Sequence, residues 1–189
     1  MKVSADLDRR FREGAAADGS LDLAFDLIDT PIGTLLVAAT SVGLCRIEFD
    51  PEPERDLGPL ARAFGSKVLR VPKALDKPKR ELDEYFERKR ERFDVPIDVR
   101  FDSFRLRVMN ELGRVPYGQV TTYGALAARA GRPAAARAVG TFMNRNPIPI
   151  VLPCHRVVGA NGSLVGYGGG LERKERLLQL EGASLTLQA

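Results

Sequence analysis

The hydrophobic pattern of the chain changes near residue 102, and this change constrains the fold more than any other feature. Before it, short apolar runs alternate with Gly-containing turns, which is typical of an antiparallel meander. The predicted strands lie at residues 24–30, 34–40 and 44–49. After it, apolar residues recur at helical spacing between turns that contain glycine or proline. We therefore predict an α+β fold, in which a small α/β module precedes a mostly helical domain.

The same pattern divides the chain into three parts. Residues 1–20 are polar and rich in alanine and glycine, so we interpret them as a flexible leader with room for one helical turn near Arg9–Arg12. The N-terminal α/β domain spans residues 21–102, and the C-terminal domain spans residues 103–189. Beyond the meander, the predicted elements of the N-terminal domain are a short helix within residues 51–64, a helix over residues 77–92 and an extended segment over residues 93–99.

Composition excludes several classes of protein. The 44% of hydrophobic residues in 189 support a real core, while no apolar run approaches the roughly 20 residues that span a bilayer. The charged N-terminus lacks the apolar stretch of a signal peptide, so we expect a cytoplasmic protein with no membrane partner. One histidine and two separated cysteines do not make a zinc site, and a disulfide between Cys45 and Cys154 is disfavoured in a reducing compartment.

Charge is distributed unevenly along the chain. Residues 103–189 hold 11 Lys and Arg against four Asp and Glu, a net +7, whereas residues 1–102 hold 18 against 21, a net −3. No acidic residue lies between Glu111 and Glu172. Such a basic half indicates either a polyanionic partner or a domain that simply carries many surface arginines.

Three short helices are predicted at the start of the C-terminal domain, and the last two resemble a helix-turn-helix. Ser103 is placed to cap the first, which extends to Leu112. Thr121 is placed to cap the second, which ends before Gly131, and Pro133 begins the third, which extends to about residue 144. An ordinary pair of packed helices has the same pattern. The acid-free basic span favours DNA or RNA binding.

Cys154 and His155 are the strongest candidates for chemistry. His155 is the only histidine, and both residues follow an apolar run, residues 148–152, that we interpret as a buried extended segment. An imidazole beside a thiol can raise its thiolate fraction, although neighbours in an extended chain point apart, so a turn or a bridging water is required. The alternative is an inert structural cysteine. A carboxylate would orient the imidazole, and the C-terminal domain offers Glu111, Glu172, Glu175 and Glu181.

The loop at residues 165–170 has few side chains, because four of its six residues are glycine. It lacks the Lys-Ser/Thr of a phosphate-binding loop, and its glycines instead allow backbone N–H groups to approach a flat ligand closely. A final amphipathic helix is predicted after it, over residues 171–180.

Taken together, the motifs of residues 115–182 closely resemble the O6-alkylguanine-DNA alkyltransferases, also called methylated-DNA–protein-cysteine methyltransferases. The matching runs, in the order and at spacings similar to those of the family, are VPYGQVTTY at 115–123, ARAVG at 136–140, NP at 146–147, PCHRVV at 153–158, GGGL at 168–171 and EG at 181–182. The N-terminal module resembles the ribonuclease H-like domain of that family in pattern only, and the leader is not covered.

The resemblance implies a set of catalytic roles. Cys154 accepts the alkyl group from guanine O6, His155 acts as its base through a water, and Glu181 completes this relay. Asn146 braces the turn that holds the thiol, and Tyr123 helps to rotate the nucleotide and assists protonation of the departing guanine. No cofactor or metal is implied, and each protein molecule is used once.

The resemblance also implies the partner, which is double-stranded DNA containing O6-alkylguanine, bound from the minor groove with the base flipped out. Arg137 fills the gap left in the base stack. The residues implied in DNA binding are Thr122, Tyr123, Arg132, Ala136 and Arg137, and those implied in the base pocket are Val157, Tyr167, Gly168 and Gly169. The expected state is a monomer, winged-helix-like in its C-terminal domain, with cooperative binding along DNA left open.

One position departs from the family pattern. Gly168 stands where some members carry a side-chain hydroxyl, so only the contact of its backbone amide is carried over.

Three alternative functions compete with alkyl transfer. The first is a sensor that binds alkylated DNA without transferring the alkyl group, but such proteins lack the reactive cysteine, and Cys154 is present. A helix-turn-helix regulator is a second alternative. A cysteine hydrolase is a third, disfavoured because the chain contains no second histidine.

Overall fold

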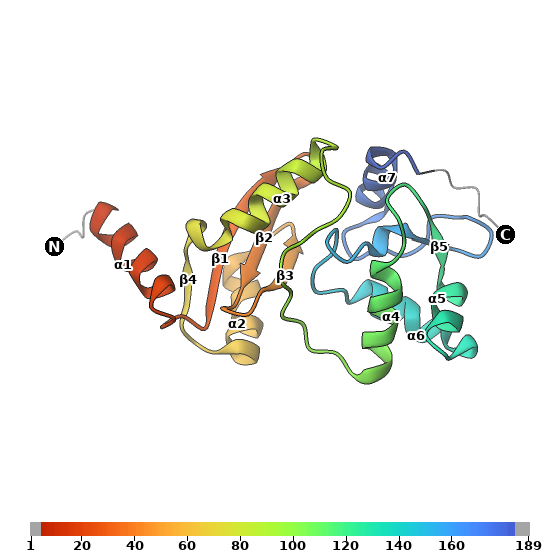
Figure 1. The fold of residues 1–189 in the computed structure, drawn as a ribbon, viewed down its shortest axis with the longest axis horizontal. Helices are drawn as coiled ribbons and strands as arrows, with labels where there is room; N and C mark the ends of the chain where they lie inside the picture. Colours follow the sequence, from red (N-terminus) through yellow and green to blue (C-terminus); the bar gives the residue numbers. More distant parts are fainter. Residues whose placement is uncertain (1–4, 184–189) are drawn as a thin grey trace. The chain divides into compact units, whose positions relative to one another are not determined.

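The computed structural model describes residues 5–183. The chain divides into two compact units after Val99, and the described residues of these units are 5–99 and 100–183 (Figure 1). Each unit has its own secondary structure and core. Within residues 5–183, none of the helices is both long enough and apolar enough to cross a bilayer.

The first unit is built on the predicted meander. Strands β1 (Leu23–Thr30), β2 (Gly33–Ala39) and β3 (Leu44–Phe49) pair antiparallel in sequence order, so this prediction is confirmed. A short strand that the sequence analysis missed, β4 (Val68–Arg70), adds to β1 in parallel and gives the order β3-β2-β1-β4. The sheet residues Leu23, Leu36, Ala38 and Cys45 form a small apolar cluster with Leu60.

The helices of this unit differ from prediction at their ends. Helix α2 (Pro53–Phe64) begins at a proline, and α3 (Asp76–Phe86) follows the 3₁₀ turn η1 (Pro72–Leu75). The α3 helix stops six residues before its predicted end, since Arg88 has a left-handed φ of 59°. The extended segment predicted at residues 93–99 makes only an isolated bridge, between Leu44 and Ile97.

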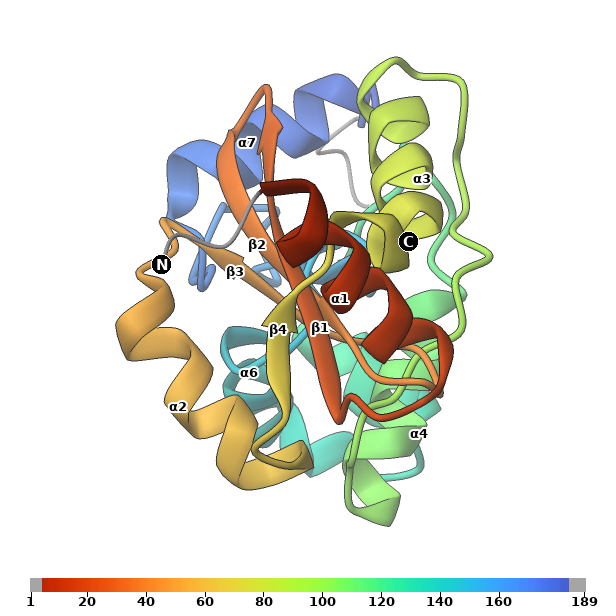
Figure 2. The same cartoon turned by 90° about the vertical axis from the view of Figure 1, so that its left-hand side faces the viewer.

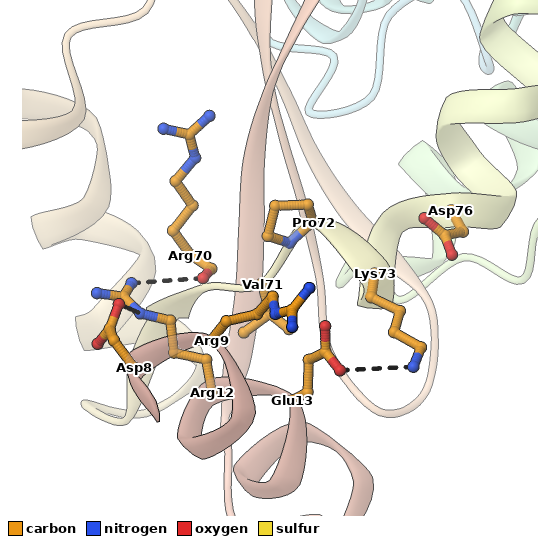
Figure 3. A pocket seen from close by; sticks show the side chains of 9 residues that line it. All are labelled: Asp8, Arg9, Arg12, Glu13, Arg70, Val71, Pro72, Lys73 and Asp76. Atoms are coloured by element: carbon orange, nitrogen blue, oxygen red, sulfur yellow. Dashed lines mark hydrogen bonds and ion pairs between the residues drawn. The ribbon is translucent and has the colours of Figure 1, made fainter. Parts of the chain in front are cut away.

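The leader also differs from prediction, because residues expected to hold at most one helical turn form α1 (Ala5–Ala17), a helix of 13 residues. It lies against η1, beside the β4 edge of the sheet (Figure 2). Arg12 Nη1 donates a hydrogen bond to the Arg70 carbonyl at 3.4 Å, and Lys73 lies 3.5 Å from Glu13. Figure 3 shows these groups around a cavity of about 500 Å³. Two ion pairs lie within its lining, Arg12 with Asp8 and Lys73 with Glu13.

The second unit contains the predicted helices with shifted caps. Asp102, not Ser103, caps α4 (Ser103–Gly113), and its carboxylate accepts from the amides of residues 104 and 105 at 2.9 Å. Thr122, not Thr121, caps α5 (Tyr123–Arg129). Both threonines form the two-residue strand β5 (Thr121–Thr122), so the helix begins one residue later than predicted. The next helix begins as a 3₁₀ turn, η2 (Pro133–Ala135), and continues as α6 (Ala136–Asn144).

The segment that carries the cysteine is a series of turns rather than an extended strand. Residues 146–153 turn sharply at Ile150, whose φ is 75°, and Cys154–Arg156 form a 3₁₀ turn, η3. The turn leads into β6 (Val157–Val158), which pairs in parallel with β5. Helix α7 (Leu171–Leu180) has its predicted bounds and closes the unit. The β5–β6 pairing thus places the start of α5 beside the chain that follows the thiol.

Candidate active site

Cys154 is held in place by the side-chain amide of Asn146, which lies two residues beyond the end of α6. Asn146 Nδ2 donates to Cys154 Sγ at 3.1 Å and to the Leu152 carbonyl at 2.7 Å, while its Oδ1 accepts from the Ile148 amide at 3.2 Å. A single amide therefore closes the turn and orients the thiol that the turn carries. This arrangement gives a physical basis to the bracing role that the resemblance implies for Asn146.

The Cys154 thiol is 3% exposed and protonated at neutral pH in this state. Burial raises its pKa to about 11, and the hydrogen bond from Asn146 and the charge of Lys174 oppose that rise. The thiolate is the nucleophilic form, so reaction at pH 7 requires a base that takes the proton. Cys45, the other free cysteine, donates to the Ala38 carbonyl within the sheet and is a packing residue.

The only imidazole of the chain lies in a buried charged network. His155 Nε2 is 2.8 Å from Glu181 Oε1, and both side chains are fully buried. Arg156 donates two hydrogen bonds to the same carboxylate, at 2.8 and 2.9 Å, and a third hydrogen bond to the Val115 carbonyl at 2.6 Å. The Gly118 amide lies 3.2 Å from Glu181 Oε2. A buried carboxylate with this many donors is held rigidly and stays ionised.

The network fixes the protonation state of the imidazole. Burial alone raises the pKa of Glu181, but hydrogen bonds from His155 and Arg156 outweigh it and lower that pKa to about 2. Burial lowers the pKa of His155, so the ring is neutral at pH 7. Because the ionised carboxylate accepts from Nε2–H, Nδ1 carries the lone pair. Within residues 5–183, this Nδ1 is buried without a hydrogen-bond partner, so it is free to accept a proton.

The glycine loop meets α5 beside this network. The Tyr123 hydroxyl donates to the Val165 carbonyl at 3.1 Å, and burial raises its pKa. Tyr167 is buried, and burial raises its pKa well above the usual value, so its hydroxyl stays protonated. A Cβ at Gly168 would lie 3.1 Å from the Asn144 carbonyl, closer than ordinary van der Waals contact. The loop therefore passes close to the end of α6, as expected for a glycine-lined pocket wall.

Two charged residues of the site were missed by the sequence analysis. Arg156 lies within the PCHRV motif, where nothing local distinguishes a buried arginine from an exposed one. Lys174 is fully buried, and a signal for it was present, because it stands three and four residues before Leu177 and Leu178, on the apolar stripe of α7. A lysine on that stripe either snorkels to water or finds buried acceptors.

Apart from Tyr123, the residues implied in DNA binding make no hydrogen bond or ion pair with Cys154, His155 or Glu181 within residues 5–183. Arg137 is exposed on α6, and its guanidinium makes no ion pair or hydrogen bond with the described residues. Ala136 is the first residue of that helix. Arg132 stacks on the Phe104 ring at 4.7 Å, and the Thr122 hydroxyl is used as the cap of α5. Of this set, Arg137 is the side chain most available to a partner.

The unit holds a buried, oriented cysteine next to a neutral histidine that is paired with an ionised glutamate, and it contains two short helices joined by a tight turn. These features define a helix-turn-helix protein with a nucleophilic thiol. Residues 23–99 match the ribonuclease-like domain of 6-O-methylguanine DNA methyltransferase, and residues 103–183 match its DNA binding domain. The chain therefore belongs to the 6-O-methylguanine DNA methyltransferase family. The predicted α+β fold, with a ribonuclease-like module before a helical domain, is confirmed.

Individual relatives agree with this assignment. A methylated-DNA–protein-cysteine methyltransferase of Methanosarcina acetivorans is 39% identical over 166 residues, which cover 84% of this chain and 98% of that protein. One from Mycobacterium tuberculosis is 42% identical over 158 residues, covering 82% and 89% respectively. The crystal structure of Mycobacterium tuberculosis OGT in complex with DNA has a TM-score of 0.74 at 38% identity, covering 86% of this chain and 96% of that one.

Proposed function

We infer that this chain repairs DNA by transferring the alkyl group of O6-alkylguanine to its own cysteine, and that Cys154 is the acceptor. One observation carries the assignment of the residue. Cys154 Sγ is held at 3.1 Å by Asn146, in the turn that also places His155 against Glu181. Membership of the family indicates the reaction, and this geometry supports Cys154 as the nucleophile.

Activation of the thiol begins with its proton. His155 Nδ1 is the available acceptor, and we assign the transfer to a bridging water, because a cysteine and the histidine that follows it do not face each other directly. The proton moves to Nδ1, and the imidazolium is stabilised by ionised Glu181. Asn146 stabilises the thiolate that results, because its hydrogen bond favours the charged form.

The chemical step is a displacement at saturated carbon. The thiolate forms a carbon–sulfur bond to the alkyl group as the bond from that carbon to guanine O6 breaks. The departing guanine takes up one proton, which balances the proton that the thiol gives to His155. We assign the assistance of this step to the Tyr123 hydroxyl, which stays protonated because burial raises its pKa. The thioether product has no easy hydrolysis, so each molecule acts once, and no cofactor enters the reaction.

The reaction requires the base to leave the duplex, because the alkyl carbon is buried in the stack. Flipping costs a few kcal/mol, and a weakly paired lesion lowers that cost. We assign Arg137 to the space left by the flipped nucleotide, and the DNA-facing surface to Ala136, Thr122 and Arg132, bound from the minor groove. The flipped base would lie against the pocket formed by Val157, Tyr167, Gly168 and Gly169. We propose that the protein works in the cytoplasm, bound to DNA at the nucleoid.

Intact mass after incubation with an O6-methylguanine duplex tests this function. The expected result is the addition of one methyl group per molecule, no second addition with excess substrate, and no addition in Cys154→Ser. Cys45→Ser is the matched control, and it should still gain the methyl group. Unchanged mass of the natural sequence with retained DNA binding would instead favour a sensor of alkylated DNA or a helix-turn-helix regulator.

A further inference from the structure

Lys174 is a buried cation that the proposed reaction does not use. Its side chain is 0% exposed in the middle of α7, and burial lowers its pKa to about 8. Removing a lysine from water is costly unless its donors are satisfied. An apolar residue at this place on the stripe of α7 would fill the same space without that cost. The position of the ammonium group therefore calls for a role other than packing.

The ammonium group is bonded to the backbone of two segments that are apart in sequence. Lys174 Nζ donates to the Val157 carbonyl at 2.5 Å and to the Val165 carbonyl at 2.8 Å. Val157 belongs to β6, three residues after the thiol, and Val165 begins the glycine loop. Each bond is charge-assisted and therefore stronger than a bond between neutral groups. One side chain thus ties the loop to the strand.

The same contact reaches Tyr123. The Val165 carbonyl accepts from the Tyr123 hydroxyl at 3.1 Å as well as from Lys174 at 2.8 Å. Loss of the lysine would leave this carbonyl, on a glycine-rich loop, positioned by the phenol alone. Residues 165–170 contain four glycines and have no regular secondary structure. The hydrogen bonds from Arg173 to the Gly169 carbonyl and from the Gly170 amide to the Tyr167 carbonyl hold the far end of the loop, so its Val165 end depends on Lys174 and Tyr123.

We propose that Lys174 is a positioning residue that holds the glycine loop and the β6 strand at the spacing required by the guanine of the substrate. The inference rests on the proposed function, since it assigns a purpose to the loop only if an alkylated base enters beside it. Lys174 makes no hydrogen bond to the thiol or the imidazole, and both of its hydrogen bonds go to the backbone of the loop and the strand. Its charge also favours the Cys154 thiolate, so its loss should affect the nucleophile as well, but less than it affects the base pocket. Both its charged and its neutral forms keep N–H donors for the two carbonyls.

This role separates two reactions of the same cysteine. Methyl transfer from an O6-methylguanine duplex needs both the thiol and the base pocket, whereas alkylation by iodoacetamide needs the thiol alone. In Lys174→Met, which keeps the length of the side chain and removes its donors, we expect methyl transfer to slow at least tenfold. Alkylation of Cys154 by iodoacetamide should slow by a smaller factor than methyl transfer does, because loss of the Lys174 charge makes the thiol harder to ionise but leaves the reaction independent of the base pocket.

Arg176→Met is the matched control, because Arg176 lies on the same helix and pairs only with exposed Glu172. It should leave both rates unchanged. A second test uses Tyr123→Phe, whose effect on methyl transfer should be less than additive with that of Lys174→Met, since both side chains act on the Val165 carbonyl. Circular dichroism melting should show that both variants are folded at the assay temperature.

Two results would overturn the proposal. Methyl transfer by Lys174→Met at the natural rate would show that the hydrogen bonds from Lys174 to the loop and to β6 are unnecessary. A parallel fall in methyl transfer and iodoacetamide alkylation would place the effect of Lys174 on the thiol and not on the pocket. Absence of methyl transfer in the unsubstituted protein is a different outcome, because it would overturn the proposed function itself and this inference with it.

Discussion

His155 Nε2 lies 2.8 Å from Glu181 Oε1, and this buried pair joins the 3₁₀ turn of the cysteine to the residue that follows α7. Arg156, the next residue in the turn, donates twice to the same carboxylate. The turn is thus fixed through two consecutive side chains onto one anion. Because both contacts depend on the negative charge, the ionisation of Glu181 governs both the stability of the unit and the tautomer of the histidine.

Glu181→Gln should therefore change how stability depends on pH. The pKa of Glu181 falls from its ordinary value of 4.5 to about 2 on folding, so its contribution is fully present above pH 4.5 and is lost as the pH falls towards 2. A shift of this size corresponds to on the order of 3 kcal/mol. Urea unfolding at several pH values should show the variant less stable at pH 7, with the difference from the natural protein shrinking below pH 4.5.

Glu175→Gln is the control for this experiment, since Glu175 is exposed on the same helix. It should leave the pH dependence unchanged. A stability difference between Glu181→Gln and the natural protein that is constant from pH 7 to pH 3 would contradict the role of the charge.

Asn146→Ala should make the thiol harder to ionise. The amide donates to Cys154 Sγ at 3.1 Å and opposes the effect of burial, so its removal should raise the pKa of the thiol further above about 11. A lost hydrogen bond to a charged group costs about 1.5–3 kcal/mol, which predicts methyl transfer slower by roughly 10- to 100-fold. The measurement is the rate of iodoacetamide alkylation of Cys154 against pH, which should shift to higher pH.

Asn144→Ala provides the comparison, because Asn144 is exposed at the end of α6 and its side chain makes no hydrogen bond within residues 5–183. Its alkylation profile should coincide with that of the natural protein. If Asn146→Ala gives the same profile, the amide supports the turn without affecting the thiol.

Local sequence signals predicted the elements whose formation depends on nearby residues. The three strands of the meander and helix α7 appear where alternation and helical periodicity placed them. Predictions based on a single polar residue were less accurate. Thr121 was expected to cap α5, but it pairs with Val157 across the β5–β6 ladder, and its neighbour Thr122 takes the cap instead. That pairing joins residues 36 positions apart in sequence and leaves no local signal.

The site shows the same division between local and distant information. From the residues alone, four carboxylates could have oriented His155, and the family resemblance indicated Glu181; the fold places it at 2.8 Å. The cysteine was expected after an extended segment, whereas Ile150 turns the chain and a 3₁₀ turn carries Cys154. The place of Lys174 on the apolar stripe of α7 was visible in the sequence, but the partners of its ammonium group were not, because they are backbone carbonyls, which every residue has. Which carbonyls bind a buried charge is decided by packing between distant segments.

Gly168→Ala should impair the pocket without unfolding the protein. An added Cβ would lie 3.1 Å from the Asn144 carbonyl, so the loop must move by a few tenths of an ångström. We expect methyl transfer from the duplex to slow several-fold, with a change in unfolding free energy of about 1 kcal/mol or less. Gly113→Ala is the control, because a Cβ there meets nothing within 4 Å. Equal transfer rates for the two variants would show that the loop tolerates the shift.

Arg137→Ala should separate repair of duplex DNA from reaction with a free base. Arg137 is exposed on α6 and makes no contact that stabilises the fold within the described part of the chain, so its removal should change the unfolding free energy by no more than about 0.5 kcal/mol. If its side chain replaces the flipped nucleotide, methyl transfer from the duplex should fall by at least tenfold, whereas transfer from free O6-methylguanine should be unchanged. Arg114→Ala, which removes an exposed arginine of the same unit, controls for the loss of one positive charge. A similar loss of duplex repair in both variants would reduce Arg137 to a general electrostatic contact, whereas a loss confined to Arg137→Ala would assign it to the gap in the base stack.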